Sequence, residues 1–142
     1  MKEFSFYLTT KRVKQQPPDT EQATAMSLAA QKRFAFAKRI AVSEDPTFVL
    51  ENAYESVREM IDALLIMKGF KSYSHEASVA YLQETNCEGA LIALLNRLRE
   101  RRNGIKYYGK SAKKEDAEKA IRVCKALFTT LQQHLKAGGE TG

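Results

Sequence analysis

The chain has 142 residues, of which 44% are hydrophobic and 28% charged, with a net charge of +6 and a pI near 9.3. This length and balance predict one globular domain with a core of its own. No apolar run approaches the roughly 20 residues of a membrane span, and the N-terminus lacks the apolar stretch of a secretory signal. Two separated cysteines, Cys87 and Cys124, are typical of a reduced, cytoplasmic protein.

Residues 1–18 carry no sustained periodicity and are interpreted as an N-terminal tail, because Pro17-Pro18 stops any helix from crossing them. Phe4, Phe6 and Tyr7 alternate along this tail. They could form a short extended segment packed on a neighbour, or the tail could be disordered, which the sequence favours. We therefore expect a folded domain over residues 19–137 and a polar C-terminal tail over residues 138–142.

The first helix is predicted to begin at Asp19, a good N-cap with Gln22 three residues further on, and to end at Ser43–Pro46. A second helix is predicted to start there, with Asp45 as N-cap and Pro46 at the first helical position, where its missing N–H costs nothing. Its expected inward face comprises Leu50, Ala53, Val57, Met60, Ile61, Leu64 and Met67.

Gly69 is expected to end this second helix, as glycines commonly do at the position after the last helical residue. Ser74 is predicted to cap a short third helix, with Val79 and Leu82 as its apolar anchors. No alternation of period two appears in residues 19–137, so no strand is expected there.

A fourth helix is predicted from Asn86 through a leucine stripe, with an interruption or bend at Asn103-Gly104 and at Gly109. Ser111 is expected to cap the last helix, and Gly138-Gly139 to end it. Four substantial amphipathic helices and one short helix, joined by short connections, predict an all-α, up-and-down four-helix bundle.

The positive charge is concentrated in one segment. Eight basic residues and a single acid, Glu100, lie between Arg97 and Lys114, so the rest of the chain is close to neutral. A local excess of this kind is what an anion-binding surface requires.

Arg102 occupies an unusual position in this segment. It continues the apolar stripe of Leu91, Leu95 and Leu98, because eleven residues at about 100° each return to within roughly 20° of the start. An inward arginine needs a carboxylate, a phosphate or several carbonyls. The alternatives are a helix that frays near Arg101, leaving the arginines solvated, or an internal ion pair. The expected partners in such a pair are Glu55, Glu59 and Asp62.

Residues 53–82 and 94–109 resemble the HEPN (higher eukaryotes and prokaryotes nucleotide-binding) domain family, and the resemblance extends over residues 20–136. The order and spacing of several short features carry it, followed by a long last helix. These features are Tyr54 early in the second helix, the Gly69 stop, Ser74-His75 opening the third helix, and Arg102-Asn103 in the fourth.

The resemblance implies a helical bundle that commonly forms homodimers, with the arginine segments of two protomers facing one cleft. Many members are metal-independent ribonucleases, often toxins paired with a small nucleotidyltransferase antitoxin. Their signature is an arginine, a polar residue and, a few positions later, a histidine that handles protons while the arginine stabilises the phosphate.

Only the first half of this signature is present. Arg102 and Asn103 match, but Tyr107, Tyr108 and Gly109 stand where the histidine should be, or Lys106 does if Arg101 is the first residue of the signature. The two histidines of the chain, His75 and His134, are out of register. Tyrosine and lysine titrate near pH 10, so either would need a pKa shift of about three units to act as the base.

Three functions follow as hypotheses, and whether the protein is an enzyme is left open. The first is a non-catalytic module that binds nucleotide or RNA phosphates, with tyrosines on which bases stack. The second is a metal-independent RNase toxin, for which the catalytic candidates are Arg102, Asn103, Tyr108 and His75. The third is a protein-interaction partner, for example of a separate nucleotidyltransferase chain. The expected phosphate- or nucleotide-binding residues are Arg97, Arg99, Arg101, Arg102, Asn103, Lys106, Tyr107, Tyr108 and Lys110.

No metal site is expected, since the cysteines and histidines lack the ligand spacings of zinc sites, and no cofactor or membrane contact is expected either.

Overall fold

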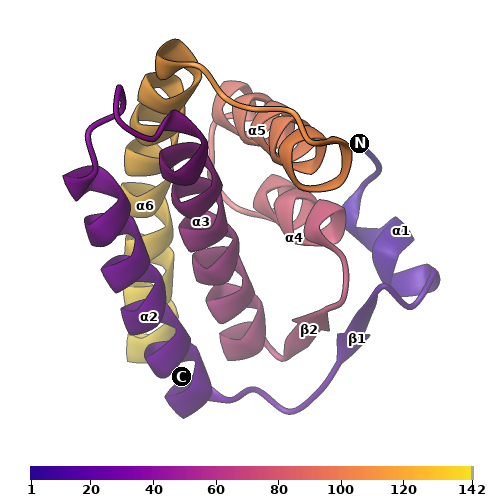
Figure 1. The fold of residues 1–142 in the computed structure, drawn as a ribbon. Coiled ribbons are helices and arrows are strands. Elements are labelled where there is room, and N and C mark those ends of the chain that lie inside the picture. The colour runs from indigo at the N-terminus through magenta and orange to yellow at the C-terminus, as the bar shows by residue number, and fades with distance from the viewer. Residues whose placement is uncertain (142) are drawn as a thin grey trace.

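The computed structural model describes the backbone of residues 1–141 and the side chains of residues 1–138. It is built almost entirely of helices (Figure 1). In chain order the elements are α1 (Phe4–Thr9), β1 (Val13–Gln15), α2 (Thr20–Arg39), α3 (Pro46–Lys68), β2 (Phe70–Ser72), α4 (His75–Tyr81), the 3-10 turn η1 (Leu82–Glu84), α5 (Gly89–Tyr108) and α6 (Lys114–Thr141).

Helix α3 is the centre of the fold and packs most extensively on α2 and α6. In Figure 1 these three long helices run side by side, while α4, α5 and the two-stranded sheet of β1 and β2 lie on the other side of α3. Large side chains of α3 such as Leu50, Tyr54 and Leu65 are fully buried. The all-α class is confirmed. The up-and-down four-helix arrangement is not, since α4 packs on α1 and β2 as well as on α3 and α5.

Local capping signals place the predicted boundaries where the structure has them. The Asp19 carboxylate accepts a hydrogen bond from the Gln22 N–H at 2.9 Å. Asp45 and Ser74 cap α3 and α4 in the same way. Gly69 ends α3 with φ of 93°, and a Cβ there would lie 2.9 Å from the Gln16 carbonyl oxygen, so only glycine fits without strain.

The first eighteen residues contradict the expected tail. They form α1 and β1, and Phe4 and Tyr7 are buried. The Phe4 ring makes edge-to-face contacts with Phe70 and Tyr81, at centroid distances of 5.6 and 5.0 Å. The region of alternating aromatics is therefore helical, and the extended segment comes later, at residues 13–15. Ring partners from distant parts of the chain stabilise this segment, which has no local signal of its own.

A two-stranded sheet also corrects the prediction that residues 19–137 contain no strand. β2 pairs antiparallel with β1, with Val13 opposite Ser72, Lys14 opposite Lys71 and Gln15 opposite Phe70. Each strand has only three residues, too few to produce a visible alternation.

Helix α5 begins differently from the prediction and is not interrupted at Asn103-Gly104, whereas its end at Gly109 agrees with the prediction. It starts at Gly89 without a side-chain cap, so Asn86 is not its N-cap. It continues unbroken through Asn103-Gly104 because packing on the core overrides the weak helix propensity of these two residues. Gly109, with φ of 66°, then ends it.

Helix α6 starts later than predicted and ends later. It begins at Lys114, and the carboxylate of Asp116 in its first turn accepts a hydrogen bond from the Lys113 N–H at 2.9 Å, so Ser111 is not the cap. Its backbone continues past Gly138-Gly139 to Thr141. At Gly138 the helix lies so close to Met67 of α3 that a side chain would not fit without a shift.

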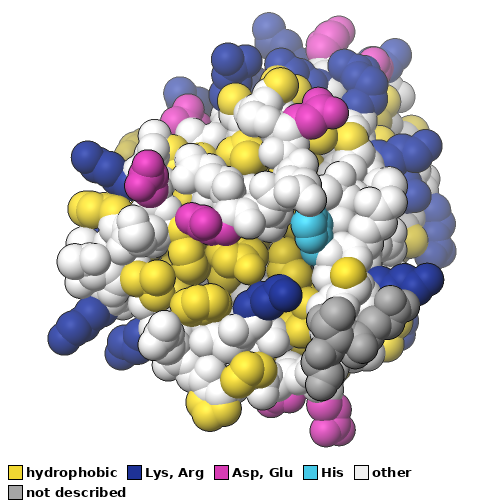
Figure 2. All heavy atoms as spheres, turned by 180° about the vertical axis from the view of Figure 1, so that it is seen from behind, with side chains coloured by type: hydrophobic (Ala, Val, Ile, Leu, Met, Phe, Trp, Pro, Cys, Tyr) yellow, Lys and Arg dark blue, Asp and Glu magenta, His cyan; other side chains and the backbone are white. Residues whose placement is uncertain are grey.

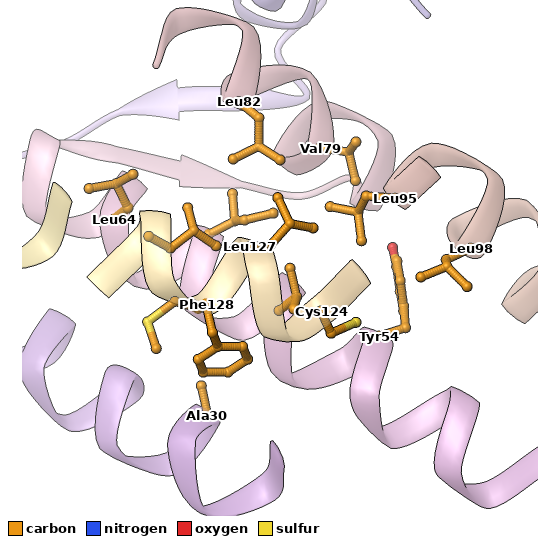
Figure 3. Packing of buried hydrophobic residues seen from close by; sticks show 14 of the residues in the cluster. Ala30, Tyr54, Leu64, Val79, Leu82, Leu95, Leu98, Cys124, Leu127 and Phe128 are labelled. Carbon is orange, nitrogen blue, oxygen red and sulfur yellow. The ribbon is translucent and has the colours of Figure 1, made fainter. Parts of the chain in front are cut away.

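Hydrophobic side chains from all the long helices fill the core (Figure 3). Phe34 of α2 stacks on Phe128 of α6 at a centroid distance of 4.7 Å. Cys124 is a buried free thiol whose pKa is raised by burial, as the apolar stripe predicted. None of the helices in the described part of the chain combines the length and apolarity needed to cross a membrane.

Candidate functional site

Arg102 of α5 faces inward, as the helical register predicts, and is only 7% exposed. Its Nη2 atom lies 3.4 Å from Oε1 of Glu55 on α3. Of the three expected acids, the structure therefore selects Glu55. Glu59 instead pairs with Arg33, and Asp62 pairs with Arg58.

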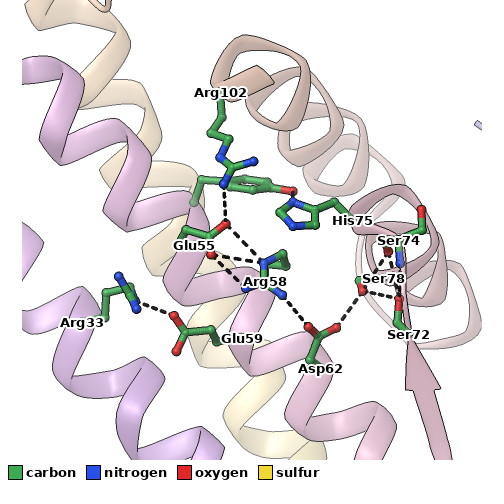
Figure 4. Close-up of polar contacts among 11 residues, drawn as sticks. Arg33, Glu55, Arg58, Glu59, Asp62, Ser72, Ser74, His75, Ser78 and Arg102 are labelled. Atoms are coloured by element: carbon green, nitrogen blue, oxygen red, sulfur yellow. Dashed lines mark hydrogen bonds and ion pairs between the residues drawn. The ribbon is translucent and has the colours of Figure 1, made fainter. Parts of the chain in front are cut away.

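Arg58 extends this ion pair into a network across the fold (Figure 4). Its guanidinium lies 2.8 Å from Glu55 and 2.6 Å from Asp62. Asp62 also accepts a hydrogen bond from Ser78 Oγ of α4 at 2.7 Å, and Ser78 Oγ lies 2.8 Å from Ser72 Oγ of β2. The network connects α5, α3, α4 and β2 around one set of charges.

The acids of the network respond in opposite directions. Burial alone would raise the pKa of Glu55, but the hydrogen bonds and charge of Arg58, with the charge of Arg102, hold it below its usual value. Burial raises the pKa of Asp62 despite the Ser78 hydrogen bond and the Arg58 charge. Glu55 is therefore the carboxylate that stays ionised most firmly beside the arginines.

His75 lies beside the same network. Its Nδ1 atom is 3.3 Å from the hydroxyl of Tyr54, with the two rings stacked at 6.0 Å. Burial and then the charge of Arg58 lower the pKa of His75 to about 4, while burial raises that of Tyr54. At neutral pH the imidazole is therefore uncharged and the tyrosine protonated. The Tyr54 hydroxyl and Nδ1 share this hydrogen bond, and the tautomer of the imidazole decides which of the two donates.

Positive charge converges on this Tyr54–His75 pair. Arg99, Arg102 and Lys106 are three and four residues apart and so share one side of α5. The charges of Arg102 and Lys106 act on His75, and those of Arg99 and Arg102 act on Tyr54. We refer to this group of side chains as the Arg102 cluster. Its members are Tyr54, Glu55, Arg58, His75, Arg99, Arg102 and Lys106.

Two of the cations have little to neutralise them. Arg99 donates from Nε to Asn96 at 3.0 Å and lies 4.0 Å from the exposed Glu100. Lys106 is exposed and makes no ion pair with any described residue. The Nε atom of Arg102 is buried and has no hydrogen-bond partner. The cluster therefore has spare donors and an excess of positive charge.

The helical turn divides the predicted basic surface in two. Arg97 and Arg101 lie on the other flank of α5, where they line a cavity of about 150 Å³ with Leu50, Asp116 and Lys119. Arg101 is paired with Asp116 at 2.6 Å. The nine expected binding residues thus do not form one continuous patch around Arg102.

The remaining expected residues lie at the end of α5. Tyr107 and Tyr108 are 64% and 78% exposed, and Lys110 is also exposed. Asn103 is half-buried. Tyr108 follows Arg102 by six residues, about 240° around the helix, and so points away from the Arg102 side of α5.

Viewed from behind, Lys and Arg side chains crowd the upper rim of the molecule, the end at which α6 begins (Figures 1 and 2). Hydrophobic side chains gather instead near the centre of that face (Figure 2).

Sequence reasoning named Glu55, Asp62 and His75 but missed Arg58 and Ser78. The only available signal for Arg58 was its spacing from Glu55 and Asp62, three and four residues away on α3. Among the described residues, no three His, Cys, Asp or Glu side chains come together in a way that could hold a metal ion. Comparisons with protein-family models, curated proteins and solved structures found no match.

Proposed function

We propose that the protein is a HEPN-like module that binds the phosphates of a nucleotide or of RNA at the Arg102 cluster, without cleaving them. The observation that carries the proposal is the charge surplus around the neutral pair formed by the buried Tyr54 and the half-buried His75. Four cations act on this pair, and only two of them, Arg58 and Arg102, pair with Glu55 or Asp62. A phosphate would supply the missing negative charge and accept hydrogen bonds from arginine N–H groups.

The internal Arg102–Glu55 pair changes which residues contact the ligand. Because Arg102 already has a carboxylate and its Nε atom is buried, its role in the proposal is to position charge. Direct phosphate contacts fall to Arg99 and Lys106, which no buried carboxylate neutralises. Tyr107, exposed beside Lys106, is the nearest expected platform for a base.

Binding is favoured over cleavage by the state of His75. A general base works best with a pKa close to the operating pH, whereas the pKa of His75 is about 4. At pH 7 such an imidazole holds almost no charge and takes up a proton weakly. His75 is nevertheless the histidine nearest Arg102, so metal-independent RNA cleavage is the second candidate. The homodimer and the nucleotidyltransferase partner that the HEPN resemblance implies stay predictions.

The direct test is a titration of the protein into fluorescently labelled single-stranded RNA over a range of salt concentrations. Affinity should fall steeply with salt, since phosphate contacts release counterions. Arg99→Gln/Lys106→Gln should lower the slope of log affinity against log salt by about 1.4, two contacts at about 0.7 each. Lys32→Gln/Lys125→Gln removes the same charge from exposed sites on α2 and α6 and serves as the matched control. Undetectable or salt-insensitive binding by the unmodified protein would refute the proposal.

A parallel incubation separates binding from cleavage. RNA held with the protein in chelator should stay intact at pH 7, and the intact RNA should be recovered after binding. Metal-independent cleavage that is lost in His75→Gln, with binding retained, would favour the second candidate.

A further inference from the structure

The outward face of the β1–β2 sheet carries a second group of cations that are far apart in the sequence. Lys14 and Lys71 are direct cross-strand partners, and both are exposed. Just beyond them, the Tyr73 N–H donates to the Arg12 carbonyl oxygen at 2.8 Å, which places Arg12 opposite Tyr73. Side chains alternate along a strand, so all four residues share one face, while Val13 points to the core.

This face has a charge arrangement that costs stability by itself. Like charges directly opposite one another on a sheet repel. Within the described residues, none of Arg12, Lys14 and Lys71 makes an ion pair with a carboxylate. An anionic ligand would relieve the repulsion, and the strand pairing keeps the three cationic residues on one face, where such a ligand could bind.

An aromatic ring sits between these charges. Tyr73 is 60% exposed, and the Nζ atoms of Lys14 and Lys71 lie 5.5 and 5.6 Å from its ring centroid. Cations beside an exposed aromatic ring are the combination by which proteins hold single-stranded nucleic acid, with phosphates on the cations and a base on the ring. Both lysines can move from the ring to a phosphate because their side chains are long and exposed.

We propose that the sheet face formed by Arg12, Lys14, Lys71 and Tyr73 is a second contact surface for single-stranded RNA. The lysines and Arg12 bind phosphates, and a base stacks on Tyr73. This inference rests on the proposed function, because it extends the same RNA beyond the Arg102 cluster.

The two surfaces adjoin along the chain. Tyr73 is two residues before His75 of the Arg102 cluster. Polar contacts hold the connecting segment, since Ser72 Oγ donates to the Ser74 carbonyl oxygen at 2.8 Å and Ser78 Oγ donates to Asp62 at 2.7 Å. A strand leaving the cations of α5 would therefore pass His75 and reach Tyr73 next.

The experiment compares matched variants in the RNA titration. Lys14→Gln/Lys71→Gln should weaken binding by about fivefold or more and lower the salt slope by about 1.4. Lys32→Gln/Lys125→Gln, with the same loss of charge, should leave both nearly unchanged. Tyr73→Ala should also weaken binding about fivefold or more, whereas Tyr73→Phe, which keeps the ring, should stay within about twofold. All these side chains are exposed, so circular dichroism should show unchanged helix content.

The outcomes distinguish this inference from the proposed function. If the unmodified protein binds RNA and the variants of the sheet face bind as tightly as the control, the inference that this face contacts RNA is overturned and the proposed function stands. If the unmodified protein does not bind RNA, both are overturned. A third result would be self-association of Lys14→Gln/Lys71→Gln with unchanged RNA affinity. It would show that the lysines only keep the sheet edge from pairing with other chains, and would also overturn the inference.

Discussion

Nη2 of Arg102 lies 3.4 Å from Oε1 of Glu55, joining the basic end of α5 to the central helix α3. Both side chains are largely buried, at 9% and 20% exposed. The pair satisfies an arginine that would otherwise be an unpaired charge in the core, and it leaves neighbouring cations available. Stability and the proposed binding at this site therefore depend on different residues, which makes them separable by mutation.

Glu55→Ala should destabilise the protein strongly. It leaves Arg102 and Arg58 without their shared carboxylate, and breaking a buried pair from one side costs about 3 kcal/mol or more. Urea unfolding followed by circular dichroism measures the loss. The control is Glu100→Ala on the exposed side of α5, 63% exposed, which should change stability by less than about 0.5 kcal/mol. Equal unfolding midpoints for the two variants would contradict a structural role for the Arg102–Glu55 pair.

Stability should fall as the pH is lowered from about 6.5 towards 4. The pKa of His75 is about 4 in the folded state against 6.5 ordinarily, so within this window the unfolded chain binds more protons than the folded one. Protonation therefore favours unfolding, and the contribution of His75 is fully present only above pH 6.5. Urea midpoints at pH 7.5 and 5 should differ less in His75→Gln than in the unmodified protein. His134→Gln should keep the full difference, and an equal reduction in both variants would count against the assignment.

Tyr54→Phe should shift the pKa of His75, and the sign of the shift identifies the donor. If the Tyr54 hydroxyl donates to Nδ1, it stabilises the neutral imidazole and its loss raises the pKa; if Nδ1–H donates to the hydroxyl, its loss lowers the pKa. Stability at pH 7 should fall by about 1 kcal/mol, the usual value of a hydrogen bond. An NMR titration of the His75 ring protons gives the pKa directly. Tyr107→Phe, at an exposed ring, is the control; a His75 pKa that is the same in both variants would disprove the contact.

Phe4→Ala should destabilise the fold even though Phe4 lies near the N-terminus. Its ring is 4% exposed and packs on Phe70 and Tyr81, so truncation leaves a cavity costing about 3 kcal/mol. Phe6→Ala, two residues away and 39% exposed, should cost much less. Thermal unfolding of the two variants measures the difference. A disordered N-terminal segment would give no difference between them.

Much of the helical framework follows from the sequence because its signals are local. The caps at Asp19, Asp45 and Ser74 and the stop at Gly69 each depend on residues within one turn, and the structure has them as predicted. The inward direction of Arg102 is also local, since a helix of fixed period carries the leucine stripe to that position. Where local propensity competes with packing, as at Asn103-Gly104, the prediction of a break was wrong.

Other features depend on residues that are distant in the chain, and only the tertiary structure decided them. The choice of Glu55 over Glu59 and Asp62 depends on how α5 crosses α3, because all three acids lie on the same helix. The burial of Phe4 depends on partners in β2 and α4, and the opposition of Lys14 and Lys71 depends on pairing between segments far apart in sequence. Periodicity places a side chain on one face of its own helix or strand. What that face meets is determined by the packing of the whole chain, and this packing brings together the charges of both proposed binding surfaces.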